Sequence, residues 1–335
     1  MTKREQDPDD EEKPHRSPRG DRAGRDKDLA AKEQGEKAKR ALPETDHGEL
    51  VLRTSRGHAW LETAARAERH VLLPRWVQLV PGDVVDVDQQ GRVNASVPRR
   101  NMLVRQVAMQ QQALAANLDR IAVVVAPGAL MREGFLNRAL CVAAAAGIPP
   151  TIIFQKVDLD TDKSMRKRAD AYRPIAEVYL TSAKTGEGTK ALEKALAGKA
   201  TAFLGHSGVG KSSLVNAIFP GAKLTTSAVD SWGKGRHTTS LARAIRLGDA
   251  LLVDLPGIRE LGLPSFDATV KNAVFPDMLV AEATCNADAP ACKHNDPASC
   301  LVLRAAAKGL VDAERWEAYR AIADSYESAL QGGGR

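Results

Sequence analysis

The chain has 335 residues, of which 43% are hydrophobic, 27% are charged and only 4% are aromatic. This length fits two or three domains better than one, and no apolar run approaches the roughly 20 residues that a transmembrane helix needs. Four cysteines are too few for a disulfide-stabilised secreted fold, and the N-terminus is charged where a signal peptide would be apolar, so we expect a cytoplasmic protein that does not enter membranes.

Residues 1–47 form the first predicted segment, a disordered charged tail. They contain 12 Lys and Arg, 13 Asp and Glu, and few apolar side chains, and such a composition cannot offset the conformational entropy of folding. The rest of the chain carries a net charge of +7. This mild basic surplus suits a polyanion such as nucleic acid, although ordinary solubility explains it equally well.

Residues 48–115 are predicted to form an N-terminal five-stranded β-barrel of the OB type. Short apolar runs are separated there by turn signals such as Pro81-Gly82-Asp83, a texture typical of strands and tight turns. Barrels of this size commonly bind nucleic acid, and the exit residues Arg99 and Arg100 favour RNA binding; the alternative is a structural barrel whose arginines face water. The predicted strands are Leu50–Arg53, His58–Glu62, Val77–Val80, Val84–Val87 and Arg92–Val97.

Residues 116–280 are predicted to form a doubly wound, mostly parallel α/β sheet with helices on both faces. Near-continuous apolar runs alternate there with helical stretches, and ligands of such sheets bind at the carboxyl ends of the strands. The predicted strands are Ile121–Val125, Thr151–Phe154, Val178–Leu180, Ala202–Leu204 and Ala250–Val253. The predicted helices are Phe135–Ala146, Met165–Glu177, Thr189–Leu196 and Lys211–Phe219.

A phosphate-binding loop follows one of these strands. Gly205-His-Ser-Gly-Val-Gly-Lys211-Ser212 matches G-x-x-x-x-G-K-[ST] without a mismatch, after an apolar strand and before a helix. Its glycines let backbone N–H groups wrap around phosphates, Lys211 neutralises the terminal phosphates, and the Ser212 hydroxyl can ligate Mg²⁺. The residues predicted to bind the nucleotide here are Gly205, His206, Ser207, Gly208, Val209, Gly210, Lys211, Ser212 and Ser213.

Two later patches complete a predicted site for magnesium and the γ-phosphate. Asp254-Leu-Pro-Gly257 ends an apolar strand, which places the Asp254 carboxylate near the metal and the Gly257 N–H near the terminal phosphate. Gly235-Arg-His-Thr-Thr239 lies between the loop and this patch, where a threonine would complete the Mg²⁺ shell. The predicted magnesium ligands are Ser212, Thr238, Thr239 and Asp254.

The base-reading element precedes the phosphate loop in the chain. Gln155-Lys156-Val157-Asp158 and Thr181-Ser182-Ala183-Lys184 each follow a predicted strand, and nothing similar follows Gly257. Asp158 can accept two hydrogen bonds from the amino edge of guanine, which adenine does not offer. A permuted order need not move the ligand, because all these loops lie at one end of a parallel sheet. The predicted guanine contacts are Gln155, Lys156, Val157, Asp158, Ser182, Ala183 and Lys184.

Residues 281–335 are predicted to form an α-helical zinc-binding domain. Cys285, Cys292, His294 and Cys300 supply three thiolates and one imidazole, a complete tetrahedral set for one structural Zn²⁺ with no open position for catalysis. Apolar residues at helical spacing predict helices at Leu301–Leu310 and Asp312–Ala329. Cys141 lies on a predicted helix and is expected in the core.

That motif order, with a barrel before it and a Cys/His cluster after it, resembles the circularly permuted GTPases of the ribosome small subunit-dependent family. The resemblance runs from about Glu49 to about Tyr326. It implies GTP hydrolysis that is stimulated by the small ribosomal subunit, a role in late maturation of that subunit, and contact with its rRNA. GTP with Mg²⁺, GDP and one Zn²⁺ are the expected ligands, and we expect a monomer that binds neither DNA nor membranes.

Two positions depart from the ordinary GTPase pattern. Family members usually have Asn where this chain has Gln155. The amide of Gln lies one methylene further from the backbone, so we expect weaker or altered binding of guanine. Ile258 stands where other GTPases have the glutamine that orients the attacking water, and it cannot hydrogen-bond. His237 is the predicted catalytic residue instead, because imidazole can hold water or accept a proton near neutral pH; the alternative is that His237 only packs.

The sequence leaves two competing functions open. The first is a non-enzymatic RNA-binding scaffold with a weakened nucleotide site, which Gln155 and Ile258 would mark and which the intact Lys211 argues against. The second is an ATPase engaged in metal handling. The complete set of four zinc ligands argues against it, because a structural zinc ion with a filled shell is not expected to be passed on. Phosphate release from GTP and from ATP, with and without small ribosomal subunits, separates the three functions.

Overall fold

The computed structural model describes residues 42–107, 110–220, 242–255, 262–288, 292, 294, 296 and 298–332. Residues 1–41 of the predicted tail therefore lie outside the described residues. The end of that predicted tail is already tied to the barrel, because Thr45 N donates to Ser96 O at 3.1 Å and Ser96 N donates to Pro43 O at 2.9 Å. Backbone pairing thus begins slightly before the predicted boundary at residue 47.

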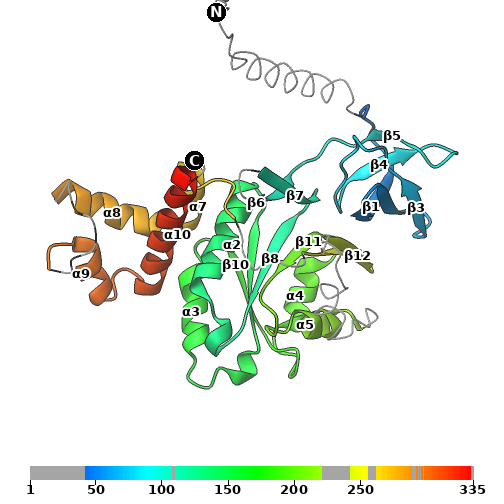
Figure 1. Cartoon of the computed structure of the whole chain (residues 1–335). Helices are drawn as coiled ribbons and strands as arrows, with labels where there is room; N and C mark the ends of the chain where they lie inside the picture. Colours follow the sequence, from blue (N-terminus) through cyan, green and yellow to red (C-terminus); the bar gives the residue numbers. More distant parts are fainter. Residues whose placement is uncertain are drawn as a thin grey trace, which may run out of the picture. The chain divides into compact units, whose positions relative to one another are not determined.

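Five antiparallel strands form the N-terminal barrel (Figure 1). β1 pairs with both β2 and β4, β2 pairs with β3, and β4 pairs with β5. Val51, Leu61 and Val85 are fully buried inside it, because successive side chains of a strand point to opposite faces. The strands are β1 (Glu49–Ser55), β2 (His58–Glu62), β3 (Glu68–Leu72), β4 (Val84–Val87) and β5 (Val93–Ser96).

The predicted third strand, Val77–Val80, is wrong. These residues pair with no strand; the apolar members Val77 and Val80 are instead buried in an irregular segment, where Val80 N donates to the Asp83 carboxylate at 2.8 Å. The actual third strand, β3, has four exposed residues out of five. It therefore lacks the apolar alternation by which a half-buried strand is recognised.

A hairpin that the sequence patterns did not predict follows the barrel. β6 (Met102–Val107) and β7 (Gln110–Ala116) form a separate two-stranded antiparallel sheet. Gln106 N donates to Gly262 O at 3.1 Å, and a Cβ on Gly262 would lie only 2.1 Å from the Gln106 carbonyl oxygen. Only glycine permits this approach of the two backbones.

The central sheet has the strand order β10, β9, β8, β11, β13 and β12. The first five strands are parallel, and β12 runs antiparallel to β13. β12 was not predicted; it also pairs with β1 of the barrel through Arg243 and Arg53. The carboxyl ends of the five parallel strands meet at one edge. The strands are β8 (Arg120–Val125), β9 (Pro150–Gln155), β10 (Glu177–Thr181), β11 (Ala200–Leu204), β12 (Arg243–Leu247) and β13 (Ala250–Asp254).

Helices cover both faces of this sheet (Figure 1). Along β8, Val123 and Val125 join the core cluster that contains α2 and α3, whereas Ala122 and Val124 join the cluster that contains α4 and α5. Burial on both faces explains why the strand is apolar throughout. The helices are α2 (Glu133–Ala145), α3 (Ser164–Tyr172), α4 (Thr189–Leu196) and α5 (Lys211–Ile218), with 3₁₀ turns η1 (Gly128–Leu130) and η2 (Val157–Leu159). α3 ends well before the predicted Glu177, because that residue already begins β10.

The described part of the C-terminal region is helical, as predicted, and α7 and α10 pack against α2. Arg315 lies at this junction and is only 1% exposed. Its Nη2 donates to Val274 O at 2.9 Å and to Asp277 Oδ1 at 3.0 Å, and its guanidinium lies 5.0 Å from the centre of the Tyr172 ring. The helices are α7 (Ala268–Val274), α8 (Pro276–Asp288), α9 (Leu301–Ala307) and α10 (Ala313–Gly332). Among the described residues, no helix is both long and apolar enough to cross a membrane.

Candidate nucleotide site and metal centre

The phosphate loop connects β11 to α5. Gly205 approaches β8 so closely that a Cβ there would lie 2.7 Å from the Val124 carbonyl oxygen. Gly210 caps α5 with φ +96°, a left-handed conformation that glycine adopts without steric strain. The loop backbone is therefore free of bulky side chains at both glycines, as the binding of phosphate oxygens by N–H groups requires.

Lys211 and Asp254 act on each other electrostatically at this edge. Lys211 Nζ donates to the carbonyl oxygens of Gly205 and His206, at 2.6 and 3.1 Å, so the ammonium group lies over the loop. Burial raises the pKa of the Asp254 carboxyl, and the positive charge of Lys211 opposes that rise. Ser212, the second residue of α5, is 9% exposed. Carboxylate and hydroxyl oxygens are ligands that Mg²⁺ prefers, and the donor chemistry of Asp254 and Ser212 fits that ion.

The base-reading segment lies directly against the phosphate loop. Lys156 has φ +65°, and its Nζ donates to the Gly208 carbonyl oxygen at 2.6 Å. A Cβ on Gly210 would lie 3.3 Å from Gln155 Cγ. Two segments 52 positions apart in the chain thus touch, which is the juxtaposition that the permuted motif order predicts.

A hydrogen bond fixes the orientation of the Asp158 carboxylate. Ser182 Oγ donates to Asp158 Oδ1 at 2.6 Å and accepts from Thr185 N at 3.2 Å. The turn that carries Ser182 is closed by Ser182 N donating to Glu187 O at 3.0 Å. The carboxylate predicted to read guanine is therefore held by the second predicted base loop, so the two loops form one unit.

Thr181 is a site residue that was missing from the predicted set. The buried Gln155 amide lies against it, and Thr181 Oγ1 is 2.6 Å from one end of that amide. We assign the amide orientation that satisfies both ends: Nε2 then donates to Thr181 O at 3.0 Å and to Thr181 Oγ1 at 2.6 Å, and Oε1 accepts from Ala183 N at 3.1 Å. The signal was present in the sequence, since Thr181 begins the Thr-Ser-Ala-Lys quartet at the end of a predicted strand.

The structure brings most of the predicted nucleotide contacts to the carboxyl edge of the sheet. These are Gln155, Lys156, Val157 and Asp158 after β9, Ser182, Ala183 and Lys184 after β10, and Gly205, His206, Ser207, Gly208, Val209, Gly210, Lys211, Ser212 and Ser213 after β11, with Asp254 ending β13. Four predicted residues lie outside the described residues: His237, Thr238, Thr239 and Gly257.

Cys285, Cys292, His294 and Cys300 converge as the spacing predicts. Their ligand atoms all lie within 4.8 Å of one another; the Sγ atoms of Cys285 and Cys300 are 3.9 Å apart, and His294 Nδ1 lies 3.3 Å from Cys300 Sγ. Three thiolates and one imidazole at such separations fit the tetrahedral shell of a structural Zn²⁺.

Glu282 and Tyr319 lie next to the histidine ligand. Glu282 Oε1 lies 3.8 Å from His294 Nε2, and Tyr319 Oη donates to the other Glu282 oxygen at 2.8 Å. The Glu282–His294 separation is longer than a direct hydrogen bond, so this carboxylate lies beside the imidazole without bonding to it in this structure. Cys141 is instead fully buried in α2, and burial raises the pKa of its thiol to about 12, which confirms that it is a core residue.

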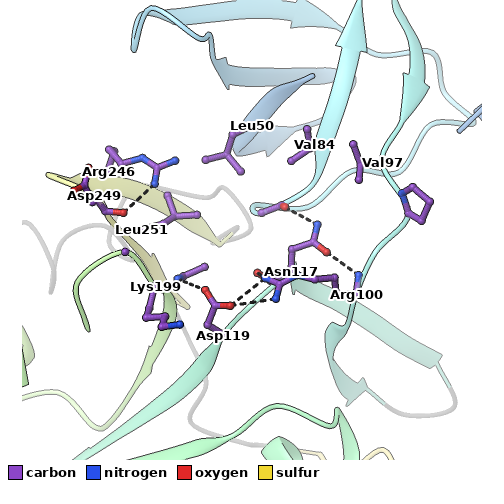
Figure 2. A pocket seen from close by; sticks show the side chains of 14 residues that line it. Leu50, Val84, Val97, Arg100, Asn117, Asp119, Lys199, Arg246, Asp249 and Leu251 are labelled. Atoms are coloured by element: carbon purple, nitrogen blue, oxygen red, sulfur yellow. Dashed lines mark hydrogen bonds and ion pairs between the residues drawn. The ribbon is translucent and has the colours of Figure 1, made fainter. Parts of the chain in front are cut away.

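A separate cavity of about 330 Å³ lies at the opposite edge of the sheet, by the amino ends of the strands (Figure 2). Ala200 and Leu251 line it from the sheet and Leu50 lines it from the barrel. Both arginines on its wall are paired, Arg100 with Asp119 at 3.2 Å and Arg246 with Glu62 at 2.7 Å. None of the predicted nucleotide contacts lines this cavity, so it is not part of the nucleotide site.

Comparisons with known proteins agree with this geometry. The family model of the RsgA GTPase matches residues 96–264. The chain is 31% identical over 287 residues to "Small ribosomal subunit biogenesis GTPase RsgA 2" of Bacteroides thetaiotaomicron, covering 82% of this chain and 90% of that one. It is 34% identical over 272 residues to "Small ribosomal subunit biogenesis GTPase RsgA" of Ectopseudomonas mendocina, covering 78% of this chain and 79% of that one.

Solved structures confirm the predicted fold class. YjeQ from Thermotoga maritima superposes with a TM-score of 0.61 at 24% identity, over 86% of this chain and 98% of that one. YloQ, described as a circularly permuted GTPase, superposes with a TM-score of 0.56 at 22% identity, over 86% and 96% of the two chains. The family match, the sequence relatives and the permuted order of the loops lead to one conclusion: the chain belongs to the RsgA GTPase family.

Proposed function

We propose that this GTPase acts in late maturation of the small ribosomal subunit, contacts the rRNA of that subunit, and hydrolyses GTP faster when bound to it. The names of both relatives support the partner, since each is called a small ribosomal subunit biogenesis GTPase. The observation that carries the GTP-hydrolysing part of the proposal is the hydrogen bond from Lys156 Nζ to the Gly208 carbonyl oxygen. This bond joins the base-reading loop to the phosphate loop, so the two loops form a single nucleotide site.

Each part of the proposed site has its own task. The phosphate loop, residues 205–213, binds the phosphates through its N–H groups, and Lys211 neutralises their charge. Asp158 accepts hydrogen bonds from the amino edge of guanine, and Ser182, Ala183 and Lys184 complete the base pocket. Gly257 binds the terminal phosphate. GTP enters with Mg²⁺, for which the proposed ligands are Ser212, Thr238, Thr239 and Asp254.

Hydrolysis is proposed to depend on His237, because Ile258 cannot orient a water molecule. A catalytic group on a segment that a partner must arrange gives slow turnover alone and fast turnover in the complex. We expect His237→Ala to abolish ribosome-stimulated turnover while GDP affinity stays within about twofold, and His237→Gln to keep part of it, since an amide can also hold water. Unchanged stimulation in His237→Ala would remove His237 from the mechanism.

The remaining proposals concern the domains and their surroundings. The domain proposed to contact rRNA is residues 48–115, which comprise the barrel strands β1–β5 and almost all of the hairpin β6–β7. Residues 1–47 are the proposed charged tail, residues 116–280 the permuted GTPase domain, and residues 281–335 the zinc-binding domain. Cys285, Cys292, His294 and Cys300 hold one Zn²⁺, which supplies a structural cross-link and no catalysis. The protein is proposed to be a cytoplasmic monomer that binds neither DNA nor membranes.

The experiment that tests the proposed function is phosphate release from GTP and from ATP, with and without purified small ribosomal subunits. We expect GTP hydrolysis to rise at least about tenfold with small subunits, and ATP hydrolysis to stay at background. Large subunits serve as the control for general contact with rRNA. An equal rise with large subunits, or no rise with small ones, would contradict the proposed partner.

A further inference from the structure

Gln155 is buried at the centre of the base-reading edge, and its amide is satisfied by the chain itself. Its side chain is 2% exposed. In the assigned amide orientation, both N–H groups of Nε2 have acceptors on Thr181, and Oε1 has a donor in Ala183 N. In the opposite orientation Oε1 accepts from Thr181 Oγ1 at 2.6 Å, but it also faces the Thr181 carbonyl oxygen, and Nε2 faces the N–H of Ala183. Acceptor then meets acceptor and donor meets donor, which disfavours that orientation. No donor of this amide is left over for a ligand.

The same side chain connects three parts of the site. Its amide bonds to the last residue of β10 and to the turn that follows, and its Cγ lies 3.3 Å from the position of a Cβ on Gly210 of the phosphate loop. That turn also carries Ser182, which donates to Asp158 Oδ1 at 2.6 Å. The position of the Asp158 carboxylate therefore depends on Gln155 through the turn.

Contact between Gln155 and the base would require the amide to give up bonds that it already makes. Leaving a buried N–H or carbonyl group without a partner costs more free energy than one new hydrogen bond between neutral groups gains. The amide hydrogens would also have to turn away from two oxygens of the same residue, Thr181. The balance favours the bonds within the protein.

We propose that Gln155 is a positioning residue that touches no atom of the guanine. It holds the turn from Ser182 to Lys184, and Asp158 with it, so that the base is read on its N1 and 2-amino edge. Position 155 then makes no contact with N7, an acceptor on the opposite edge of the base. This inference rests on the proposed function, since it takes a guanine nucleotide as the ligand.

Two nucleotide analogues test the proposal in the full-length chain with Mg²⁺. 7-Deaza-GDP lacks the N7 acceptor, and IDP lacks the 2-amino group that Asp158 would bind; the affinities of both are measured by competition with a fluorescent GDP. We expect the wild type to bind 7-deaza-GDP within about twofold of GDP, and IDP at least about tenfold more weakly, as loss of a charge-assisted hydrogen bond predicts. A loss of about fivefold or more on 7-deaza-GDP would overturn the proposal, because N7 would then be read.

The variant Gln155→Leu tests the positioning role. It keeps the approximate volume and removes every hydrogen bond of the amide, so we expect the preference for GDP over IDP to fall at least about threefold while the ratio of 7-deaza-GDP to GDP stays near one. A general loss of stability would not change the first ratio selectively. Gln111→Leu, the same change at an exposed position of β7, should leave both ratios unchanged.

The outcomes separate this inference from the proposed function. An unchanged preference for GDP over IDP in Gln155→Leu would overturn the positioning role. If Gln155→Leu does not fold, as thermal unfolding would report, the wild-type ratio for 7-deaza-GDP still decides whether N7 is read. Failure of the wild type to bind GDP at all would overturn the proposed function, and this inference with it.

Discussion

The nucleotide site and the metal centre of this protein are assembled in opposite ways. The nucleotide site collects loops that follow β9, β10, β11 and β13, and it is held by bonds within the protein, such as those of Gln155 and Lys156. The metal centre takes its four ligands from one short stretch of the chain, Cys285 to Cys300. The first site needs a folded sheet and no ligand, whereas the second needs a metal ion to hold its thiolates together.

The largest expected effect is the loss of the metal. Cys285→Ser should reduce bound zinc from about one ion per chain to near zero, and helices α8 and α9 should become sensitive to proteolysis, because structural zinc supplies folding free energy directly. GDP affinity should change by less than about threefold, since the nucleotide site does not depend on the metal. Metal analysis and limited proteolysis measure this, with Cys141→Ala as the control that keeps its zinc. A full zinc content in Cys285→Ser would contradict the assigned ligands.

Removal of the phosphate-loop lysine should weaken nucleotide binding and leave the fold stable, whereas loss of the metal should do the reverse. Lys211→Ala should weaken GDP binding at least about 100-fold while the melting temperature stays within about 2 °C, because the site is held by backbone bonds that the substitution leaves in place. Lys199→Ala, at an exposed position on the cavity at the other edge, is the control and should bind GDP normally. Isothermal titration calorimetry gives both affinities, and equal binding by the two variants would disprove the phosphate role.

The junction between the two regions should depend on Arg315. Arg315→Met removes the bonds to Val274 and Asp277 and should lower the free energy of unfolding by roughly 1–3 kcal/mol, because the carbonyl oxygen of the buried Val274 loses its hydrogen-bond donor. Arg304→Met, at an exposed position on α9, should cost less than about 0.5 kcal/mol. Urea unfolding measures the difference. Equal stability of the two variants would mean that Arg315 does not hold the helices together.

The smallest effect concerns the charge on Asp254. Burial raises the folded-state pKa of this carboxyl above its ordinary value of 3.8, so the folded protein binds its proton more tightly than the unfolded chain does. Binding of this proton stabilises the folded state fully at a pH below the ordinary pKa. That stabilisation is lost as the pH rises through the raised folded-state pKa. Asp254→Asn should therefore melt at a higher temperature than the wild type at pH 7 without nucleotide, and the difference should shrink as the pH falls. A difference that grows on acidification would contradict this sign.

The sequence predicted which segments come together at the two sites better than it predicted the strands at the edges of the fold. The strands around the phosphate loop were found because burial on both faces makes them apolar, and the phosphate loop because its glycines and lysine have fixed spacing. β3 was missed because three of its five side chains are polar or charged. β12 was missed because its two arginines interrupt a short apolar run and its pairing is with strands elsewhere in the sheet. The third strand was placed at Val77–Val80 because burial without pairing gives the same apolar pattern as burial in a sheet.

Contacts between distant residues were beyond prediction for a different reason. Arg315 carries no local signal that it is buried, since its partners Val274 and Asp277 belong to other helices. Thr181 likewise has its role because the neighbouring strand β9 places Gln155 directly beside it. Residue type and spacing identify a loop that binds phosphate, but only the folded chain shows which side chains hold that loop.

The central claim is that loops far apart in the chain meet on one guanine nucleotide. Equilibrium binding of GDP and of ADP to the purified full-length protein with Mg²⁺ tests it most directly. We predict that GDP binds at least about 100-fold more tightly than ADP, because the Asp158 carboxylate finds its hydrogen-bond donors only on guanine. Equal affinity for the two nucleotides, or no retention of either, would contradict the claim.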